Sequence, residues 1–307
     1  VRYIIGSGSS SFYTPSSRIW ANSYDGQRIN AEKYANMGGH VLRFDKKGNV
    51  YPSSFHYNHL NKSFCVNGKA YSSKGKPEKA DLHLLISDVH AKLMDKKAFN
   101  GLLKFINKNK DRIKSLSING DFFDNVMLCH HNEHNISAQI KDKIAHKSFL
   151  HEIAHARSVL DVLVNSLNDD VQLYFKMGNH EVNSVRKILQ KPLLHFLDTM
   201  LNLETLLGLK EYGFEVIDGR KPYYVGNIPI WHGHEMHRRK ASRIHGSENV
   251  CGHSHKGTID NSGTILPTFE KAEHAEYLNY HLEPWTTGWA VLHEYKGIVS
   301  RPELILF

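Results

Sequence analysis

The sequence predicts an α/β fold, and three observations support it. From Asp81 onward, short apolar runs alternate with longer stretches in which apolar residues recur at helical spacing. Several of these apolar runs end directly in Asp, Asn or His. The composition is that of a globular protein, with 40% apolar and 23% charged residues among 307. Alternating strands and helices are typical of layered α/β domains, and this length allows one large domain or two smaller ones.

The expected elements follow from apolar patterning and turn signals. Two stretches have helical spacing, Leu93–Ile106 and Ser137–Leu167. A final hairpin is expected from Trp289–Tyr295 and Ile298–Phe307, with its turn at Lys296-Gly297. The buried strands and hairpins before it are expected at Leu82–Ile86, Ser115–Ile118, Val171–Phe175, Tyr223–Trp231 (split at Gly226-Asn227) and Asn249–Cys251.

Residues 1–79 lack the alternation of strand-like and helix-like patterns that begins at Asp81. They also contain no recognisable catalytic or metal-binding motif. A short helix is expected over Arg28–Met37, a hairpin over Val41–Tyr51, a turn at Asn67-Gly68 and a linker over Lys74–Pro77. We therefore expect an accessory N-terminal segment over 1–79 and a main domain over 80–307. Scattered basic and aromatic residues leave open that this segment binds nucleic acid.

Five short polar blocks follow the expected strands of the main domain. Each block alone is a weak signal, because the chain has 22 histidines. In open α/β sheets, however, ligands bind at the carboxyl ends of strands, so we expect the blocks to converge on one edge. The blocks are Asp88-Val89-His90, Gly120 to Asn125, Gly178 to Glu181, His232-Gly233-His234 and Gly252 to His255.

With these five blocks in this order, the chain resembles the calcineurin-like metallophosphoesterase superfamily. The resemblance covers about Asp81 to Phe307, and Glu283 to Val291 is similar to the closing strand of phage and bacterial members. It implies a four-layer α/β/β/α sandwich with a small N-terminal extension. It also implies a two-metal centre in which a hydroxide bridging the metals attacks phosphorus.

The resemblance also implies a role for each residue. His180 would be the general acid for the leaving oxygen, and Asp124 would accept a hydrogen bond from it. His234 stays open as an alternative to His232. The two divalent ions would be Mn²⁺, with Fe, Zn²⁺ or Mg²⁺ as alternatives, because a mixed nitrogen and oxygen set does not choose among them. The implied metal ligands are Asp88, His90, Asp121, Asn179, His232, His253 and His255, with Asp121 as the bridge.

Departures from the family patterns bear on the substrate. Protein Ser/Thr phosphatases have Asp-Arg-Gly where this chain has Asp124-Asn125, so the phosphate-gripping Arg is missing. The Gly252 to His255 block instead matches the branch of SbcD-like nucleases, cyclic-nucleotide phosphodiesterases and small phosphodiesterases. Those nucleases usually have Asp where this chain has Glu181.

The expected activity is a divalent-metal-dependent phosphodiesterase acting on nucleic acid or nucleotides. A phosphomonoesterase (nucleotide or protein phosphatase) and a non-catalytic, metal-stabilised binding module are the alternatives. The excess of eight basic over acidic residues favours an anionic partner such as DNA or RNA. The basic run His237 to Lys240 with Arg243 is either a contact surface for the phosphates of a polyanion or a solvated basic face. His130 and His131 follow the second block closely, and a structural or surface role is expected for them rather than a place at the mouth of the site. Specificity is expected to reside in 1–79 and 126–170.

A rival motif occurs at His151-Glu152-Ile153-Ala154-His155, which satisfies the H-E-x-x-H pattern of zinc proteases. It lacks the extended downstream form, and chance matches are frequent in a histidine-rich chain.

The expected location is cytoplasmic, in a bacterium or an infected host cell. The three cysteines, Cys65, Cys129 and Cys251, are too few for a disulfide framework. No apolar run approaches the roughly 18 residues of a membrane span, and the chain start has no secretory pattern.

Overall fold

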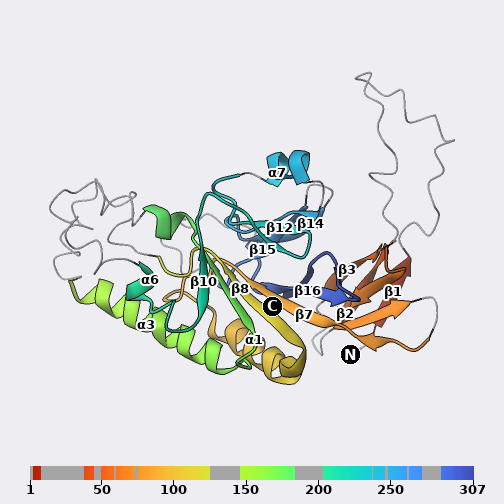
Figure 1. The fold of residues 1–307 in the computed structure, drawn as a ribbon, viewed down its shortest axis with the longest axis horizontal. Helices are drawn as coiled ribbons and strands as arrows, with labels where there is room; N and C mark the ends of the chain where they lie inside the picture. The colour runs from red at the N-terminus through yellow and green to blue at the C-terminus, as the bar shows by residue number, and fades with distance from the viewer. Residues whose placement is uncertain are drawn as a thin grey trace, which may run out of the picture. The chain divides into compact units, whose positions relative to one another are not determined.

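The computed structural model has an α/β fold with several sheets and few helices (Figure 1). The chain forms two compact units. The first comprises Val1–Ala80 with His293–Glu303, and the second comprises Asp81–Leu292 with Leu304–Phe307. The structure describes residues 3–7, 38–44, 50–58, 60–72, 75–124, 146–183, 203–236, 238–245, 248–260, 263–271 and 285–307.

The first unit contains a six-stranded antiparallel sheet with strands in chain order. The hairpin expected over Val41–Tyr51 is confirmed, with Phe44 paired to Val50. The turn at Asn67-Gly68 is confirmed as well, because both residues have positive φ, as type I′ hairpin turns require. The helix expected over 28–37 lies outside the described residues. The strands are β1 (Tyr3–Ser7), β2 (Gly38–Phe44), β3 (Val50–Asn58), β4 (Ser63–Val66), β5 (Lys69–Ser72) and β6 (Glu78–Lys79).

A segment from the end of the chain completes the core of the first unit. Tyr295 packs with Cys65, Ala70 and Ala80, and its hydroxyl donates a hydrogen bond to Glu78 at 2.5 Å. The N-terminal unit therefore also includes 293–303, which the sequence analysis assigned to the main domain over 80–307. Nothing in the local pattern of these residues indicates which unit they join.

A seven-stranded sheet carries the first three polar blocks. Its strands lie in the order β10-β9-β8-β7-β16-β17, with β18 paired to β16. The neighbours β7, β8, β9 and β10 are parallel, so their carboxyl ends lie at the same edge. The strands are β7 (Asp81–Ile86), β8 (Ile113–Asn119), β9 (Gln172–Lys176), β10 (Phe214–Ile217), β16 (Gly288–Tyr295), β17 (Ile298–Val299) and β18 (Glu303–Leu306).

A five-stranded sheet carries the remaining two blocks, in the order β11-β12-β13-β15-β14. The central strands β12, β13 and β15 are parallel, and the outer pairs are antiparallel. The sequence predicted the β11–β12 hairpin and β13, but it missed β14 and β15. The strands are β11 (Tyr223–Val225), β12 (Ile228–Trp231), β13 (Val250–Cys251), β14 (Lys256–Asp260) and β15 (Gly263–Pro267).

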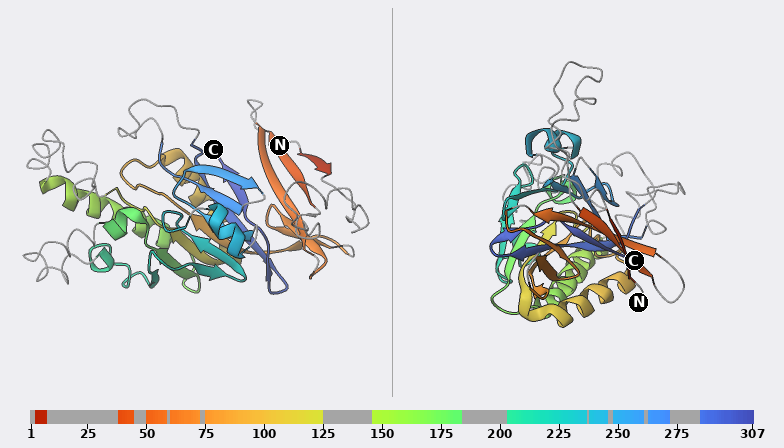
Figure 2. Two further views of the ribbon diagram at one scale, coloured as in Figure 1. Left: turned by 90° about the horizontal axis from the view of Figure 1, so that it is seen from above. Right: turned by 90° about the vertical axis from the view of Figure 1, so that its right-hand side faces the viewer.

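The helices of the second unit cover different sheets. Helices α1 (Lys96–Asn109) and α3 (His146–Asn165) pack their apolar faces on the seven-stranded sheet and form the main core. Helix α7 (Arg238–His245) packs Ala241 against Trp231 and Cys251 of the five-stranded sheet. Figure 1 and the right-hand view of Figure 2 show α1 and α7 on opposite sides of this unit. Two shorter helices are η3 (Lys110–Arg112) and α6 (Leu203–Leu206).

Three boundaries differ from the expected elements for local reasons. Helix α1 begins at Lys96 rather than Leu93, because the Asp95 side chain caps it by accepting from the main-chain nitrogens of Lys97 and Ala98 at 2.7 and 3.2 Å. The last expected strand divides into β17 and β18 around Pro302, which has no main-chain N–H to donate. For the second expected helix, the structure describes only the part from His146.

The described helices include none that is both long and apolar enough to cross a membrane.

A matched pair on α3 tests the packing of the main core. Leu160 is fully buried, whereas Val162 on the same helix is 49% exposed. We expect Leu160→Ala to lower the free energy of unfolding by about 2–5 kcal/mol, because it leaves a cavity. Val162→Ala should change it by less than about 0.5 kcal/mol. Urea denaturation followed by circular dichroism measures both, and equal losses would contradict this assignment of the buried face.

Candidate metal centre

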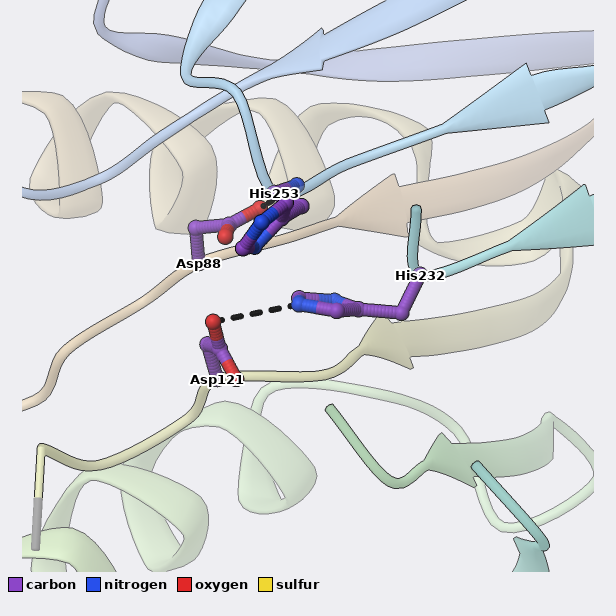
Figure 3. Close-up of side chains that lie close together, drawn as sticks. All are labelled: Asp88, Asp121, His232 and His253. Carbon is purple, nitrogen blue, oxygen red and sulfur yellow. Dashed lines mark hydrogen bonds and ion pairs between the residues drawn. The ribbon is translucent and has the colours of Figure 1, made fainter. Parts of the chain in front are cut away.

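The five predicted blocks lie in five loops of the second unit, each directly after a strand. Three loops follow β7, β8 and β9 of the seven-stranded sheet, and two follow β12 and β13 of the five-stranded sheet. Figure 3 shows Asp88, Asp121, His232 and His253, from four of these loops, directed toward one another. The sequence predicted that the blocks converge on one rim. The strands that precede them belong to two sheets, because β12 and β13 pair with each other while β7, β8 and β9 lie in the seven-stranded sheet.

The glycines of the blocks permit a close approach of the loops. A β-carbon on Gly252 would lie 2.8 Å from Oδ2 of Asp88, and one on Gly178 would lie 2.5 Å from the main-chain nitrogen of Asp121. Real β-carbons essentially never approach so closely. Gly120 has in addition a φ of +82°, which side-chain-bearing residues rarely adopt. Each glycine therefore lets one loop contact the next at main-chain distance.

Several candidate ligands have left-handed backbone conformations. Side-chain-bearing residues rarely have positive φ, and such conformations cluster at functional sites. Five of the eight such residues in the described part of the chain are predicted ligands. They are Asp88 (φ 50°), His90 (42°), Asp121 (49°), His253 (66°) and His255 (59°).

One group of potential ligands is formed by Asp88, His90 and His255, which are all buried. Nε2 of His255 lies 3.0 Å from Oδ1 of Asp88. The His90 ring lies 5.4 Å from the His255 ring, centroid to centroid. This is the set that the resemblance implies for the first metal.

A second group is formed by Asp88, Asp121, His232 and His253. Nε2 of His232 lies 3.1 Å from Oδ2 of Asp121 and 3.1 Å from Oδ1 of Asn179. Asp88 belongs to both groups, and Asp121 forms a further group with His90 and His180. The carboxylates therefore lie where two cations would share ligands. Oxygen and imidazole donors suit divalent cations from Mg²⁺ to Zn²⁺, so the residues fit the implied centre.

Hydrogen bonds fix which nitrogen two of the imidazoles present to this centre. Nδ1 of His232 donates to the carbonyl of Asn119 at 2.7 Å, and Nδ1 of His90 donates to the Asp124 carboxylate at 2.7 Å. In both rings Nε2 is therefore the nitrogen available to a cation, and the partner on Nδ1 fixes the ring orientation. His234, the alternative to His232, belongs to none of the ligand groups found among the described residues.

The predicted partnership of His180 and Asp124 needs correction. Nδ1 of His180 donates to the main-chain carbonyl of Asp124 at 2.6 Å, not to its carboxylate. The carboxylate is occupied by His90, because the loop turns the Asp124 side chain toward the first ligand group. The main-chain nitrogen of His180 donates to Asp121 at 3.0 Å. His180 thus borders both ligand groups, and its half-buried ring lies 5.2 Å from the His90 ring.

Opposite charges decide the protonation of the buried groups. Burial alone would raise the pKa of Asp88, but the imidazoles of His255 and His232 outweigh it and lower that pKa to about 2. Burial likewise works against a charged His232, yet Asp121 raises its pKa to about 10. Asp121 is therefore paired with a protonated His232, whereas burial and the charge of His232 lower the pKa of His253. A cation that binds there must displace protons from the rings.

Two residues of the H-E-x-x-H motif on α3 form hydrogen bonds to the main chain of neighbouring loops. Glu152 is buried and accepts a hydrogen bond from the main-chain nitrogen of Asp124 at 2.8 Å. His155 donates through Nε2 to the carbonyl of Ala91 at 3.1 Å. His151 is exposed, and no ligand group among the described residues includes any of the three. The motif holds the loops after β7 and β8 and does not form a zinc-protease site.

Glu181 ties the loop after β9 to the loop after β8. Its fully buried carboxylate accepts three main-chain hydrogen bonds, from Asp121 at 3.0 Å, Phe122 at 2.9 Å and Gly178 at 2.8 Å. These bonds fix the backbone of Asp121 and the start of the helical turn at 179–183 that carries Asn179. The Glu that departs from the nuclease pattern therefore has a structural use here.

A buried ion pair holds the loop after β12. Lys176 is fully buried, and its Nζ lies 3.1 Å from Glu235 and donates to three main-chain carbonyls. Glu235 accepts from the main-chain nitrogens of His232 and Gly233 at 3.0 and 2.8 Å. The charge of Lys176 is thus neutralised by the carboxylate that positions a candidate ligand.

The structure brings together all nine predicted site residues, but sequence reasoning missed several supporting side chains. Lys176 and Glu235 lie within two residues of a predicted block, and Glu181 lies inside one, although its supporting role was not predicted. Glu152 and Glu270 lie far from any block. His130 and His131 lie outside the described residues.

No protein-family model matches this chain, and no curated protein matches it in sequence. The geometry of the loops therefore carries the functional argument.

Replacing Glu181 tests the link between the loops after β8 and β9. In Glu181→Gln, an amide NH₂ would face main-chain N–H groups, so we expect about 1–3 kcal/mol lower free energy of unfolding. Glu211→Gln is the control, because that side chain is 70% exposed and makes a surface ion pair worth about 0–1 kcal/mol. Urea denaturation compares the two. Wild-type stability in Glu181→Gln would contradict the proposed link.

Proposed function

We propose that this chain is a divalent-metal-dependent phosphoesterase of the calcineurin-like type, acting as a phosphodiesterase on nucleic acid or nucleotides. One observation carries the proposal. The seven side chains implied as ligands come from five loops and meet in overlapping groups that share Asp88 and are linked through Asp121. Overlapping groups with shared carboxylates are what a two-metal site needs.

The fold is compatible with the proposal. Helices α1 and α3 pack on the seven-stranded sheet, β15 of the five-stranded sheet contacts β7, and α7 packs on the five-stranded sheet. We propose that these layers form the four-layer α/β/β/α sandwich of the family. Its ligand-bearing loops all leave the carboxyl ends of strands.

The residues of the site have two kinds of role, metal binding and positioning of the ligands. Asp88, His90, Asp121, Asn179, His232, His253 and His255 would hold two divalent cations, with Mn²⁺ as the first candidate. When bound, such cations activate a water molecule and neutralise the charge on the phosphoryl oxygens. Asp124 orients His90 through its carboxylate, and Glu181 and Glu235 fix the backbone of the ligand loops.

His180 is placed to move a proton. Its Nδ1 donates to the carbonyl of Asp124, which fixes the ring orientation, and we propose that Nε2 is the nitrogen that acts on substrate. The ring is half-buried and borders both ligand groups. A proton held on that nitrogen would be donated to the departing oxygen of the ester.

A basic helix favours a polyanionic substrate. Helix α7 begins soon after the loop that carries His232, and its residues Lys240 and Arg243 are exposed. Exposed basic side chains contact phosphates without regard to base sequence. The predicted contact residue His237 lies outside the described residues.

The first test is metal-dependent turnover. With Mn²⁺, the protein should hydrolyse bis(p-nitrophenyl) phosphate faster than p-nitrophenyl phosphate, and a chelator should abolish the activity. Asp121→Asn should be inactive, because it removes the shared anionic ligand. The matched control Asp111→Asn, at an exposed position, should retain full activity. Absence of turnover with Mn²⁺, Fe²⁺, Zn²⁺ and Mg²⁺ would contradict the proposal and favour a binding module. Preference for the monoester would indicate a phosphomonoesterase.

The role of His180 is tested by the leaving group. p-Nitrophenolate leaves as a stable anion, whereas a nucleotide alkoxide needs a proton. His180→Gln should therefore lower kcat about 100- to 10,000-fold on a dinucleotide and much less on bis(p-nitrophenyl) phosphate. His151→Gln, exposed on α3, should leave both rates unchanged. Equal losses on the two substrates would refute proton donation by His180. Peptide hydrolysis that depends on His151 would support the zinc-protease hypothesis instead.

A further inference from the structure

Glu270 is a carboxylate that no motif singled out, and it lies against the first ligand group. Its side chain is fully buried. Oε2 of Glu270 is 3.6 Å from Nε2 of His90 and 3.9 Å from Nδ1 of His255. It therefore faces two of the three residues that form the group with Asp88.

The backbone around Glu270 is fixed to the loop that carries Asp88. The Thr268 hydroxyl donates to the carbonyl of Asp88 at 2.7 Å and accepts from the main-chain nitrogen of Glu270 at 2.9 Å. The main-chain nitrogen of Phe269 also donates to Asp88, at 3.1 Å, and Glu270 forms a β-bridge with Met94. The position of this carboxylate is therefore set by the same loop that positions the predicted ligands.

The separations do not correspond to hydrogen bonds. Nitrogen–oxygen distances of 3.6 and 3.9 Å exceed the usual limit of about 3.2 Å. Nε2 of His90 and Nδ1 of His255 are buried and have no hydrogen-bond partner among the described residues. Two ligand atoms bonded to one cation at about 2.0–2.2 Å lie roughly 3–4 Å apart. The 3.6 Å between Oε2 of Glu270 and Nε2 of His90, the nitrogen that His90 presents to a cation, falls within this range.

We propose that Glu270 is an additional ligand of the cation held by Asp88, His90 and His255. This inference rests on the proposed metal-dependent function and adds a residue outside the five blocks. With Glu270, the first position has an oxygen-rich set in which Asp88, Glu270 and the shared Asp121 outnumber two imidazoles. Oxygen-rich sets favour Mn²⁺, Fe²⁺ and Mg²⁺ over Zn²⁺.

Mn²⁺ binding to the full chain, measured by calorimetry, provides the first test. The wild-type protein should bind two Mn²⁺ ions. Glu270→Gln should weaken one of them more than about 100-fold, because loss of a merely orienting partner costs about 10- to 100-fold. Glu303→Gln is a matched control: it is a buried Glu whose carboxylate lies 3.5 Å from the His293 ring in the first unit. It should leave both affinities unchanged.

The outcomes separate this inference from the proposed function. If the wild-type protein binds no Mn²⁺, the proposed function fails. If it binds two ions and Glu270→Gln binds them equally well, or loses less than about 100-fold, only the role of Glu270 as a ligand is overturned. Circular dichroism of each variant shows whether it folds.

A wild-type crystal soaked in Mn²⁺ tests the ligand directly, even if Glu270→Gln fails to fold. Anomalous scattering locates the ions. An oxygen of Glu270 within about 2.0–2.2 Å of one of them supports the inference. An oxygen that instead hydrogen-bonds a ring nitrogen, beyond bonding distance of the ion, overturns it.

Discussion

The burial of five carboxylates in one small region is the constraint around which the second unit is organised. Asp88, Asp121, Asp124, Glu181 and Glu270 are each at most 6% exposed. A buried charge is tolerated only when hydrogen bonds, opposite charges or a cation replace its lost hydration. The loops, the glycines and the left-handed conformations around these residues are consistent with meeting that demand.

The carboxylates meet the demand in different ways. Glu181 is satisfied by three main-chain N–H groups, so it needs no cation. Asp121 relies mainly on imidazoles and one main-chain donor. Asp88 relies on an imidazole, one main-chain donor and the hydroxyl of Ser87. Glu270 faces imidazoles at distances too long for hydrogen bonds. Under the proposed function, Asp88 and Asp121 would gain most from cations, so metal binding and stability of this unit would be coupled.

The supporting side chains follow the same electrostatic logic. Glu235 neutralises the charge of the buried Lys176. The same carboxylate positions the loop that carries His232. Glu152 and His155, which resemble a protease motif in sequence, separately hold the loops after β8 and β7. A motif defined by spacing on a helix places side chains on one face, but the neighbouring elements decide what that face does.

The sequence predicted which residues meet in these loops, because each of them follows its strand within a few residues. A strand's end fixes the position of the next side chains, so apolar runs followed by Asp, Asn or His place Asp88, Asp121 and Asn179 at one edge. It could not predict that Asp124 turns its carboxylate to His90, because spacing along the chain does not determine a rotamer. Glu270 was not predicted. It reaches the first ligand group because its own segment is hydrogen-bonded to the loop after β7.

The two ligand groups differ in exposure, and this asymmetry indicates where substrate would arrive. In the first group, Asp88, His90 and His255 are all buried, and Glu270 closes it further. In the second, His253 is exposed. A site that binds substrate needs an open coordination position, whereas a closed set serves structure. Under the proposed function, the phosphate would therefore enter at the second position. Its loop after β12 leads directly into α7 and its exposed Lys240 and Arg243.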